Sequence, residues 1–217
     1  MSTRALIALA IGALIAPCIA NGKPPVKPPA ASNYTVYTDK ASFLAALGEV
    51  TFQGFEASPE FACPPYPNDY SGVGSSFESA SFAATIIPES GGTAFLCVGD
   101  DMTTAMTPRA TEGTHFLSVG SVLGNDWTLD FNLFASRPVY AVGFYMVDAA
   151  EAGDAIFVGP DGTRITILEC CQPGGSTRFF GVVSNKPLSS FSLEGSPSDG
   201  WAIDEVMLGF GRPKGRR

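Results

Sequence analysis

Hydrophobic and polar residues alternate with a period of two along much of the chain, which is typical of β-strands with one buried face. In "DWTLDFNLF", Trp127, Leu129 and Phe131 fall on one face, and polar residues occupy the other. The segment "VYAVGFYMVD" (139–148) is apolar on both faces and predicts a central strand that is covered on both sides. In "AIFVGPDGTRITIL" (155–168), a Gly-Pro-Asp-Gly turn separates two apolar runs and predicts a β-hairpin.

One stretch, "YTVYTDKASFLAALG" (34–48), predicts a short strand followed by a short helix. Thr38 or Asp39 can cap the start of the helix, and Gly48 can end it. Its apolar residues recur at helical spacing and should face the core: Phe43, Leu44 and Leu47. Eight to ten short strands around this helix predict an all-β fold, a two-sheet antiparallel jelly-roll sandwich with one short N-terminal helix.

Composition agrees with an all-β domain, because the 217 residues include 24 Gly, 17 Pro, 16 Phe and 6 Tyr, which are common in turns and strands. Residues 1–20 have a basic start, a short apolar run and small residues before Asn21, as in a secretory signal peptide. A Pro-rich linker (21–33), a β-sandwich domain (34–210) and a basic tail (211–217) follow. We therefore expect a secreted or cell-surface protein without a membrane span in the mature chain.

Charge is distributed unevenly along the chain, whose net charge is −8. All 21 acidic residues lie between Asp39 and Glu205, together with only six of the 13 Lys and Arg residues. A domain this acidic repels phosphate backbones, so we expect no nucleic-acid partner. The excess of carboxylates is compatible with calcium, and equally with a solvated acidic surface. The pattern indicates no particular oligomeric state.

Four cysteines remain after the predicted cleavage site: Cys63, Cys97, Cys170 and Cys171. An even number in an exported protein suggests two disulfides, for which three pairings are possible. Adjacent side chains on a strand point to opposite faces, so Cys170 and Cys171 would not easily reach Cys63 and Cys97 together. We favour a Cys63–Cys97 bond and a bond between the two neighbours, although the neighbours can also stay reduced.

Asp204 and Glu205 stand side by side in "WAIDEVMLG", a run that otherwise predicts a buried strand. A carboxylate that points inward needs a partner, because burial of an unpaired charge is costly. "GFE" (54–56) and "IDEV" (203–206) are similar to a pattern in galactose-binding-like jelly rolls and carbohydrate-binding modules. In those modules an early Glu and a late Asp hold a structural calcium. The resemblance implies calcium at Glu56 and Asp204, with Glu205 where a second Asp is usual.

The wider chain resembles secreted bacterial proteins that often carry a PEP-CTERM sorting tail. "YTDKASFLAALG", "FEA", "FFGVVSNKPLSSFSLEG" and "WAIDEVMLG" carry this likeness over most of residues 34–210. The Pro-Glu-Pro signal and its apolar C-terminal helix are missing from this sequence, so the resemblance does not imply anchoring by that route.

The sequence favours a binding function over an enzymatic one. His115 is the single histidine and lies in an alternating strand, and the chain has no G-x-S-x-G or H-E-x-x-H motif. Glycan binding needs exposed aromatic side chains with polar neighbours, and Trp201, Tyr66 and Tyr70 are the candidates, with core packing as the alternative for Trp201. We predict a non-catalytic module that binds a glycan or cell-surface polymer. A secreted glycan-active hydrolase and a structural matrix or surface protein are the alternatives.

Overall fold

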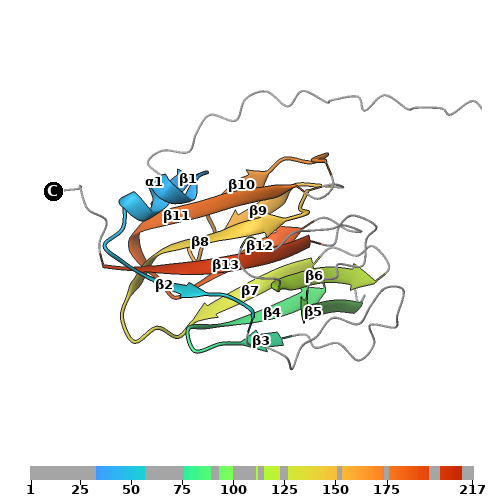
Figure 1. Ribbon diagram of the computed structural model, residues 1–217, viewed down its shortest axis with the longest axis horizontal. Coiled ribbons are helices and arrows are strands. Elements are labelled where there is room, and N and C mark those ends of the chain that lie inside the picture. Colours follow the sequence, from blue (N-terminus) through green and yellow to red (C-terminus); the bar gives the residue numbers. More distant parts are fainter. Residues whose placement is uncertain are drawn as a thin grey trace, which may run out of the picture. The chain divides into compact units, whose positions relative to one another are not determined.

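The computed structural model describes residues 33–56, 76–88, 93–99, 111, 115–122, 127–150, 153–173, 176–195 and 201–211. These residues form two antiparallel β-sheets and one short helix, which confirms the predicted all-β sandwich with a short N-terminal helix (Figure 1). Within them, no helix is long and apolar enough to cross a membrane. The predicted signal peptide, almost all of the linker and most of the basic tail lie outside the described residues.

One sheet contains seven strands, six of which follow a continuous hydrogen-bonded path while the seventh, β2, pairs with β13. The path runs in the order β1 (Tyr34–Tyr37), β11 (Thr177–Leu188), β8 (Val139–Val147), β13 (Trp201–Phe210), β6 (Phe116–Val122) and β5 (Thr93–Gly99). β2 (Glu49–Gln53) lies antiparallel to the second half of β13, as Figure 1 shows. The early and final strands of the domain are therefore neighbours, although they are far apart in the sequence.

The other sheet contains six strands and covers the inner face of the first. Its order is β10 (Arg164–Leu168), β9 (Ala155–Val158), β12 (Ser190–Gly195), β7 (Trp127–Leu133), β4 (Phe82–Pro88) and β3 (Ser76–Glu78). The predicted hairpin is β9 and β10, whose turn is closed by a 2.8 Å hydrogen bond from the Gly159 amide to the Thr163 carbonyl. The predicted inward face of β7 is also confirmed, because Trp127, Leu129 and Phe131 are all buried.

The core between the sheets is rich in aromatic side chains. Phe191 of β12 stacks on Phe131 of β7 with ring centroids 4.3 Å apart. It also lies near Phe157 of its own sheet and Phe144 of the opposite sheet. Each of these four rings is almost completely buried, and burial of such a side chain contributes roughly 1.5–3 kcal/mol. This core fixes the two sheets to each other and so holds the ends of their strands, and the side chains there, in defined positions.

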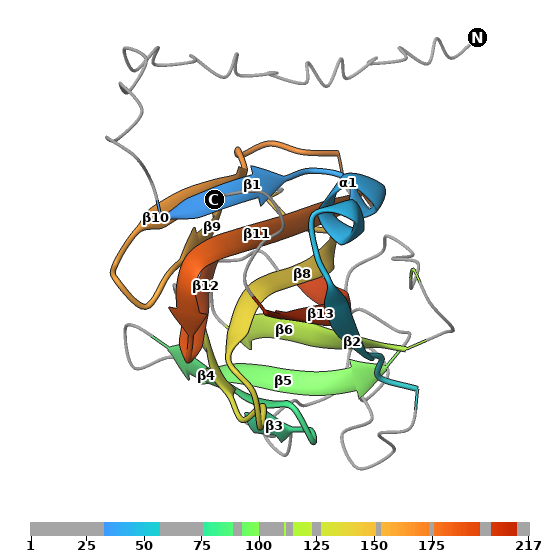
Figure 2. The same cartoon turned by 90° about the vertical axis from the view of Figure 1, so that its left-hand side faces the viewer.

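The helix α1 (Lys40–Ala45) lies on the outer face of the seven-stranded sheet beside β11, as Figures 1 and 2 both show. Asp39 caps its start by accepting a 2.8 Å hydrogen bond from the amide of Ser42. Ala46 is the C-cap residue, so the expectation that Gly48 would end the helix is wrong by two residues. A second small core forms here from Phe43, Leu47 and side chains of the sheet.

Phe43 lies directly on the backbone of the sheet because two glycines face each other beneath it. Gly143 of β8 pairs with Gly181 of β11 in register. A Cβ atom at Gly143 would lie 2.7 Å from Cε1 of Phe43, and one at Gly181 would lie 2.5 Å from its Cδ2. Both distances are too short for carbon atoms, so these two glycines make the close approach of the helix possible.

Three strands, β3, β4 and β5, lie in a stretch where the sequence pattern indicated strands without marking any one of them. β4 alternates buried with half-buried residues, but one of its inward positions is the small Ala84 and its last residue is Pro88. Its period of two is therefore weak, because alanine and proline do not mark a buried strand. Among the described residues there are thirteen strands, against the eight to ten that were predicted.

Candidate functional site

A bulge in β13 explains why this strand carries two adjacent acids. β13 follows the register of β8 up to Asp204 and again from Met207, with an irregularity between them. Glu205 lies in this irregularity and has a left-handed φ of 53°. On its other edge, β13 pairs with β6 through residues 201–203 and with β2 through residues 206–210. The acids thus lie where the strand exchanges one partner for another, a typical place for a bulge.

The two carboxylates have different partners. Asp204 is fully buried, and its Oδ2 accepts hydrogen bonds from the amide and hydroxyl of Thr111 at 2.6 and 2.7 Å. Its Oδ1 accepts the amide of Glu205 at 2.7 Å. The carboxylate of Glu205 forms an ion pair with Lys40 of α1 on the outer face of the sheet. Donors and an ammonium group therefore compensate both charges, as burial of a carboxylate requires.

Glu56, the third acid of the predicted calcium site, follows the end of β2. It accepts a 2.7 Å hydrogen bond from the amide of His115, and its Oε2 lies 3.0 Å from the ring Nδ1 of that histidine. Calcium takes six to eight oxygen ligands, so two acids supply only part of a site. Within the described residues, no group of three or more His, Cys, Asp or Glu side chains gathers as a metal site.

Of the two interpretations of Trp201, the structure supports core packing and not an exposed binding platform. Its side chain is fully buried and packs against Trp127 with ring centroids 4.8 Å apart. Gly195 allows this packing, because a Cβ atom there would lie 2.6 Å from Trp127 and 2.7 Å from Trp201. The other two candidates, Tyr66 and Tyr70, lie outside the described residues.

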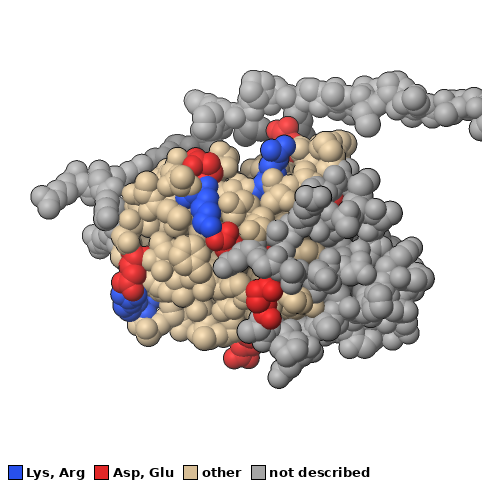
Figure 3. Space-filling model, viewed as in Figure 1, with Lys and Arg blue, Asp and Glu red and all other residues tan. Residues whose placement is uncertain are grey.

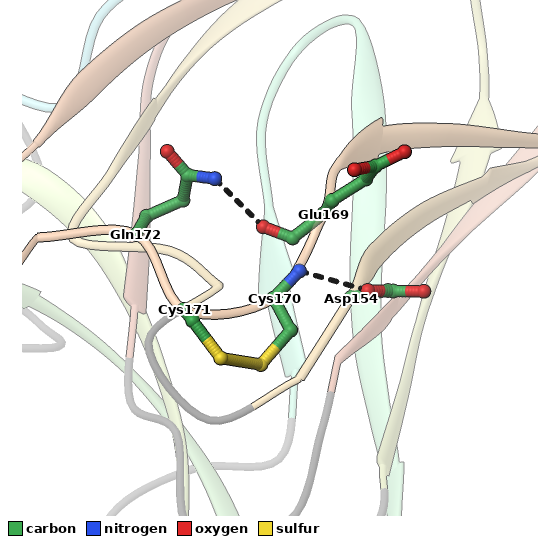
Figure 4. The surroundings of a disulfide bond; sticks show 5 residues. All are labelled: Asp154, Glu169, Cys170, Cys171 and Gln172. Carbon is green, nitrogen blue, oxygen red and sulfur yellow. Dashed lines mark hydrogen bonds between the residues drawn. A yellow bond between two sulfur atoms is a disulfide. The ribbon is translucent and has the colours of Figure 1, made fainter. Parts of the chain in front are cut away.

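The structure joins Cys170 and Cys171 by a disulfide bond (Figure 4). Cys97 is buried in β5 and is also disulfide-bonded. Cys63, its predicted partner, lies outside the described residues. The Cys170–Cys171 bond belongs to the segment between β10 and β11, away from the acids of β13 in the sequence.

A surface groove that the sequence did not indicate lies where β2 and β8 begin and β13 ends. Its volume is about 370 Å³, and its lining includes Glu49, Arg137, Tyr140 and Phe210. Glu49 and Val139 both pair with Phe210, so these strand ends bring the lining residues together. Polar and aromatic groups therefore meet in one hollow, which is the chemical composition of a site for a small polar ligand.

An ion pair with two hydrogen bonds spans the groove. Arg137 donates from Nη1 and Nη2 to the two carboxylate oxygens of Glu49, at 2.7 and 2.5 Å. The guanidinium carbon also lies 4.6 Å from the centre of the Phe210 ring. The hydrogen bonds from Arg137 lower the pKa of Glu49, and those to Glu49 raise the pKa of Arg137. The pair is thus fixed in its charged form and carries no net charge.

The face drawn in Figure 3 has no large area of one charge among its described residues. Acidic and basic side chains are scattered, several of them beside one another, and uncharged residues separate them. Opposite charges are also paired in the ion pairs of Lys40 with Glu205 and of Arg137 with Glu49. A ligand on this face would meet mainly neutral and paired groups.

A second, smaller hollow of about 230 Å³ lies beside the β9–β10 turn. There Asp161 accepts hydrogen bonds from Asn33 Nδ2 at 2.8 Å and from the Tyr34 hydroxyl at 3.0 Å. The bond from Asn33 is the largest cause that lowers the pKa of Asp161 to about 2. Burial, with help from the same carboxylate, raises the pKa of Tyr34. These contacts tie the turn to the first strand of the domain.

No protein-family model matches the chain, and no curated protein matches it. Among solved structures, it is similar to the K1 cleaved adhesin domain of Lys-gingipain from Porphyromonas gingivalis W83, with 13% identity, coverage of 76% of this chain and 99% of that chain, and a TM-score of 0.47. It is also similar to the family 11 carbohydrate-binding module from Clostridium thermocellum, solved with a β-1,3-1,4-mixed-linked tetrasaccharide, with 10% identity, 62% and 92% coverage and a TM-score of 0.37. A third is TmCBM61 in complex with β-1,4-galactotriose, with 15% identity, 59% and 88% coverage and a TM-score of 0.34. At these identities and TM-scores, the comparisons assign neither a family nor a ligand to this chain.

Proposed function

We propose that the chain is an exported, non-catalytic binding module whose ligand is a glycan. The observation that carries this proposal is the groove formed by Glu49, Arg137, Tyr140 and Phe210, where a fixed ion pair stands beside two half-buried aromatic side chains. Sugars present hydroxyl groups that both donate and accept hydrogen bonds, and C–H faces that pack on aromatic rings. The groove offers partners for both.

The ion pair is well suited to hydroxyl groups. Arginine has five N–H bonds and donates two of them to Glu49, so the remaining ones can donate to a sugar oxygen. The oxygens of Glu49 retain lone pairs that can accept the proton of the same or the neighbouring hydroxyl. Since the positive and negative charges cancel, the groove favours neutral sugars over acidic ones. We therefore propose neutral oligosaccharides as the ligand class.

A glycan array with matched variants tests this proposal. We expect the protein to bind neutral oligosaccharides and Tyr140→Ala to weaken binding roughly two- to tenfold, because loss of an aromatic contact costs about 0.5–1.5 kcal/mol. Glu49→Gln should also weaken binding, because the amide supplies one acceptor in place of two. Phe52→Ala is the matched control, since Phe52 is 49% exposed and does not line the groove. A protein that binds no glycan, or variants that bind as well as the control, would contradict the proposal.

The same samples separate the two alternatives. Cleavage of a bound oligosaccharide that stops on a single acid-to-amide substitution would identify a hydrolase. Self-assembly into ordered particles without any glycan binding would identify a matrix or surface protein. The proposed module should show neither behaviour.

An extracytoplasmic location is part of the proposal. The leader-like residues 1–20 support it, and so does the disulfide between Cys170 and Cys171, because disulfides persist mainly in oxidising compartments. A fusion of residues 1–20 to a reporter that is active only outside the cytoplasm should be exported. Retention of the reporter in the cytoplasm would contradict this part of the proposal.

Structural calcium at Glu56 and Asp204 is a separate proposal. The pairing of β2 with β13 supports it, because Glu56 follows β2 and Asp204 lies in β13. We expect the melting temperature to fall when a chelator removes the ion, and to recover when calcium is added back, because an ion that binds only the folded state stabilises it. Identical melting curves with and without chelator would contradict the proposed calcium site.

A further inference from the structure

Left-handed backbone conformations are concentrated in two loops, which contain residues 148–150 after β8 and residues 169–173 between β10 and β11. Of the four non-glycine residues with left-handed φ among those described, three lie here: Asp148 at 59°, Ala150 at 67° and Cys171 at 72°. The loops are joined by a 3.0 Å hydrogen bond from the amide of Gln172 to the carbonyl of Ala150, and Asp148 donates its amide to Ser176 at 2.8 Å. Among L-amino acids mainly Asn and Asp adopt this region readily, so Ala150 and Cys171 are the unfavourable positions, and such positions tend to gather at functional sites.

The Cys170–Cys171 disulfide lies in the middle of this strained segment. Figure 4 shows how the surrounding groups hold it: the amide of Cys170 donates to Oδ1 of Asp154 at 2.8 Å, and Nε2 of Gln172 donates to the carbonyl of Glu169, also at 2.8 Å. Cys171 is exposed and Cys170 is half-buried. Cys171 thus lies on the surface, and thiol–disulfide exchange requires access of this kind.

This bond contributes little to the stability of the fold in the chain-entropy picture. A disulfide stabilises mainly by restricting the unfolded chain, and its effect grows with the number of residues that it encloses. Cys170 and Cys171 are adjacent, so their bond encloses no residue between them. Neither cysteine belongs to the buried core between the sheets. Breakage of the bond should therefore leave the domain folded, while Cys171 becomes free to leave the left-handed region.

We propose that Cys170–Cys171 is a thiol-exchange site, a reversible two-electron centre that sets the conformation of the two loops. The thiolate of a small-molecule thiol attacks Sγ of Cys171, the protein disulfide breaks, and Cys170 leaves as a thiolate that takes up a proton. A second thiolate then attacks the sulfur of the first thiol in this mixed disulfide. Cys171 leaves as a thiolate and is protonated in turn. The protein gains two electrons and two protons, and the two small thiols become one disulfide.

Redox titration with peptide mapping tests the proposal on the intact protein. Trypsin releases Cys170 and Cys171 on the peptide 165–178, and Cys63 and Cys97 together on the peptide 41–109, which serves as an internal reference. In glutathione buffers of increasing reducing strength, followed by alkylation, we expect half-reduction of peptide 165–178 at a thiol-to-disulfide ratio at least about tenfold lower than that for peptide 41–109. Reduction of both peptides at the same ratio would overturn the proposal.

Hydrogen exchange shows whether the loops respond. When only peptide 165–178 is reduced, the amide of Gln172 should exchange at least about tenfold faster, while the amides of β8 keep their protection and the melting temperature stays nearly unchanged. A variant with Cys170→Ser and Cys171→Ser should exchange like the reduced protein in all buffers. Unchanged exchange at Gln172 after reduction, or unfolding of the whole domain, would contradict the proposal. Because this experiment contains no glycan, its outcome is independent of the proposed binding function.

Discussion

Replacement of Gly143 by alanine should destabilise the domain through a single, identifiable contact. The added Cβ would lie 2.7 Å from Cε1 and 3.0 Å from Cζ of Phe43, and 3.1 Å from Cζ of Phe179. Phe43 is the buried residue of α1 and packs between the helix and the sheet, so its ring cannot move aside without a shift of the helix. Overpacking of this kind costs about 1–3 kcal/mol. Alanine in place of glycine within a strand otherwise gains about 0.5–1 kcal/mol, so we expect a net loss of roughly 1–2 kcal/mol.

The Phe43→Leu background makes this prediction specific. Leucine lacks the Cε and Cζ atoms of phenylalanine, so Gly143→Ala should cost close to nothing there, with only the Phe179 contact remaining. Gly181→Ala should behave differently, because its Cβ would lie 2.5 and 2.9 Å from Cδ2 and Cγ of Phe43, atoms whose counterparts leucine retains. The Phe43→Leu background should therefore remove most of the stability loss caused by Gly143→Ala, and should leave the loss caused by Gly181→Ala in place.

Urea unfolding followed by tryptophan fluorescence measures both effects, because Trp127 and Trp201 are buried. Gly48→Ala is the matched control: a Cβ there meets no atom within 4 Å, so its effect should stay within about 0.5 kcal/mol. If Gly143→Ala lowers the free energy of unfolding equally in the native and the Phe43→Leu backgrounds, this prediction is wrong. The result would show that the ring of Phe43 does not lie on the backbone of β8.

Two further predictions concern the hydrogen-bonded carboxylates of Asp161, which is exposed, and Asp204, which is buried. The stability that Asp161 adds should be present above the ordinary pKa of 3.8 and should vanish as the pH falls to about 2, because its folded-state pKa is lowered. The difference in melting temperature between the native protein and Asp161→Asn should therefore be constant above about pH 5 and close towards pH 2, and a constant difference throughout would contradict this. In the presence of chelator, Asp204→Asn should lose about 2–4 kcal/mol in urea unfolding, because one amide oxygen replaces a carboxylate that accepts three donors. Thr111→Val, which removes one of those donors, should cost only about 1–2 kcal/mol, and an Asp204→Asn variant as stable as the native protein would rule out this role of the carboxylate.

The features that the sequence predicted well are local ones. Period-two alternation identified the buried face of β7, because neighbouring residues on a strand point to opposite sides whatever the rest of the chain does. The Gly-Pro-Asp-Gly turn and the cap at Asp39 likewise depend on a few adjacent residues. β4 carries a weaker local signal for the same reason, because small and cyclic residues interrupt its alternation although its neighbours in the sheet hold it.

The site could not be predicted because it depends on partners far away in the sequence. Glu49 and Arg137 are 88 residues apart and meet only because β2 and β8 both flank β13. The roles of Asp204 and Glu205 follow from a bulge, which depends on where β13 exchanges β6 for β2. Tryptophan is a residue type that sugar-binding sites use, but Trp201 is buried because Trp127 of the distant strand β7 packs against it.

The most direct test of the central claim is an NMR titration of the ¹⁵N-labelled protein with a neutral oligosaccharide selected on the glycan array. We expect the shifted amide signals to cluster around Glu49, Arg137, Tyr140 and Phe210. The shifts should saturate as the oligosaccharide is added, and the affinity obtained from them should be lower for Tyr140→Ala. Shifts that cluster elsewhere, such as beside Asp161, or no shift with any neutral oligosaccharide, would contradict the central claim.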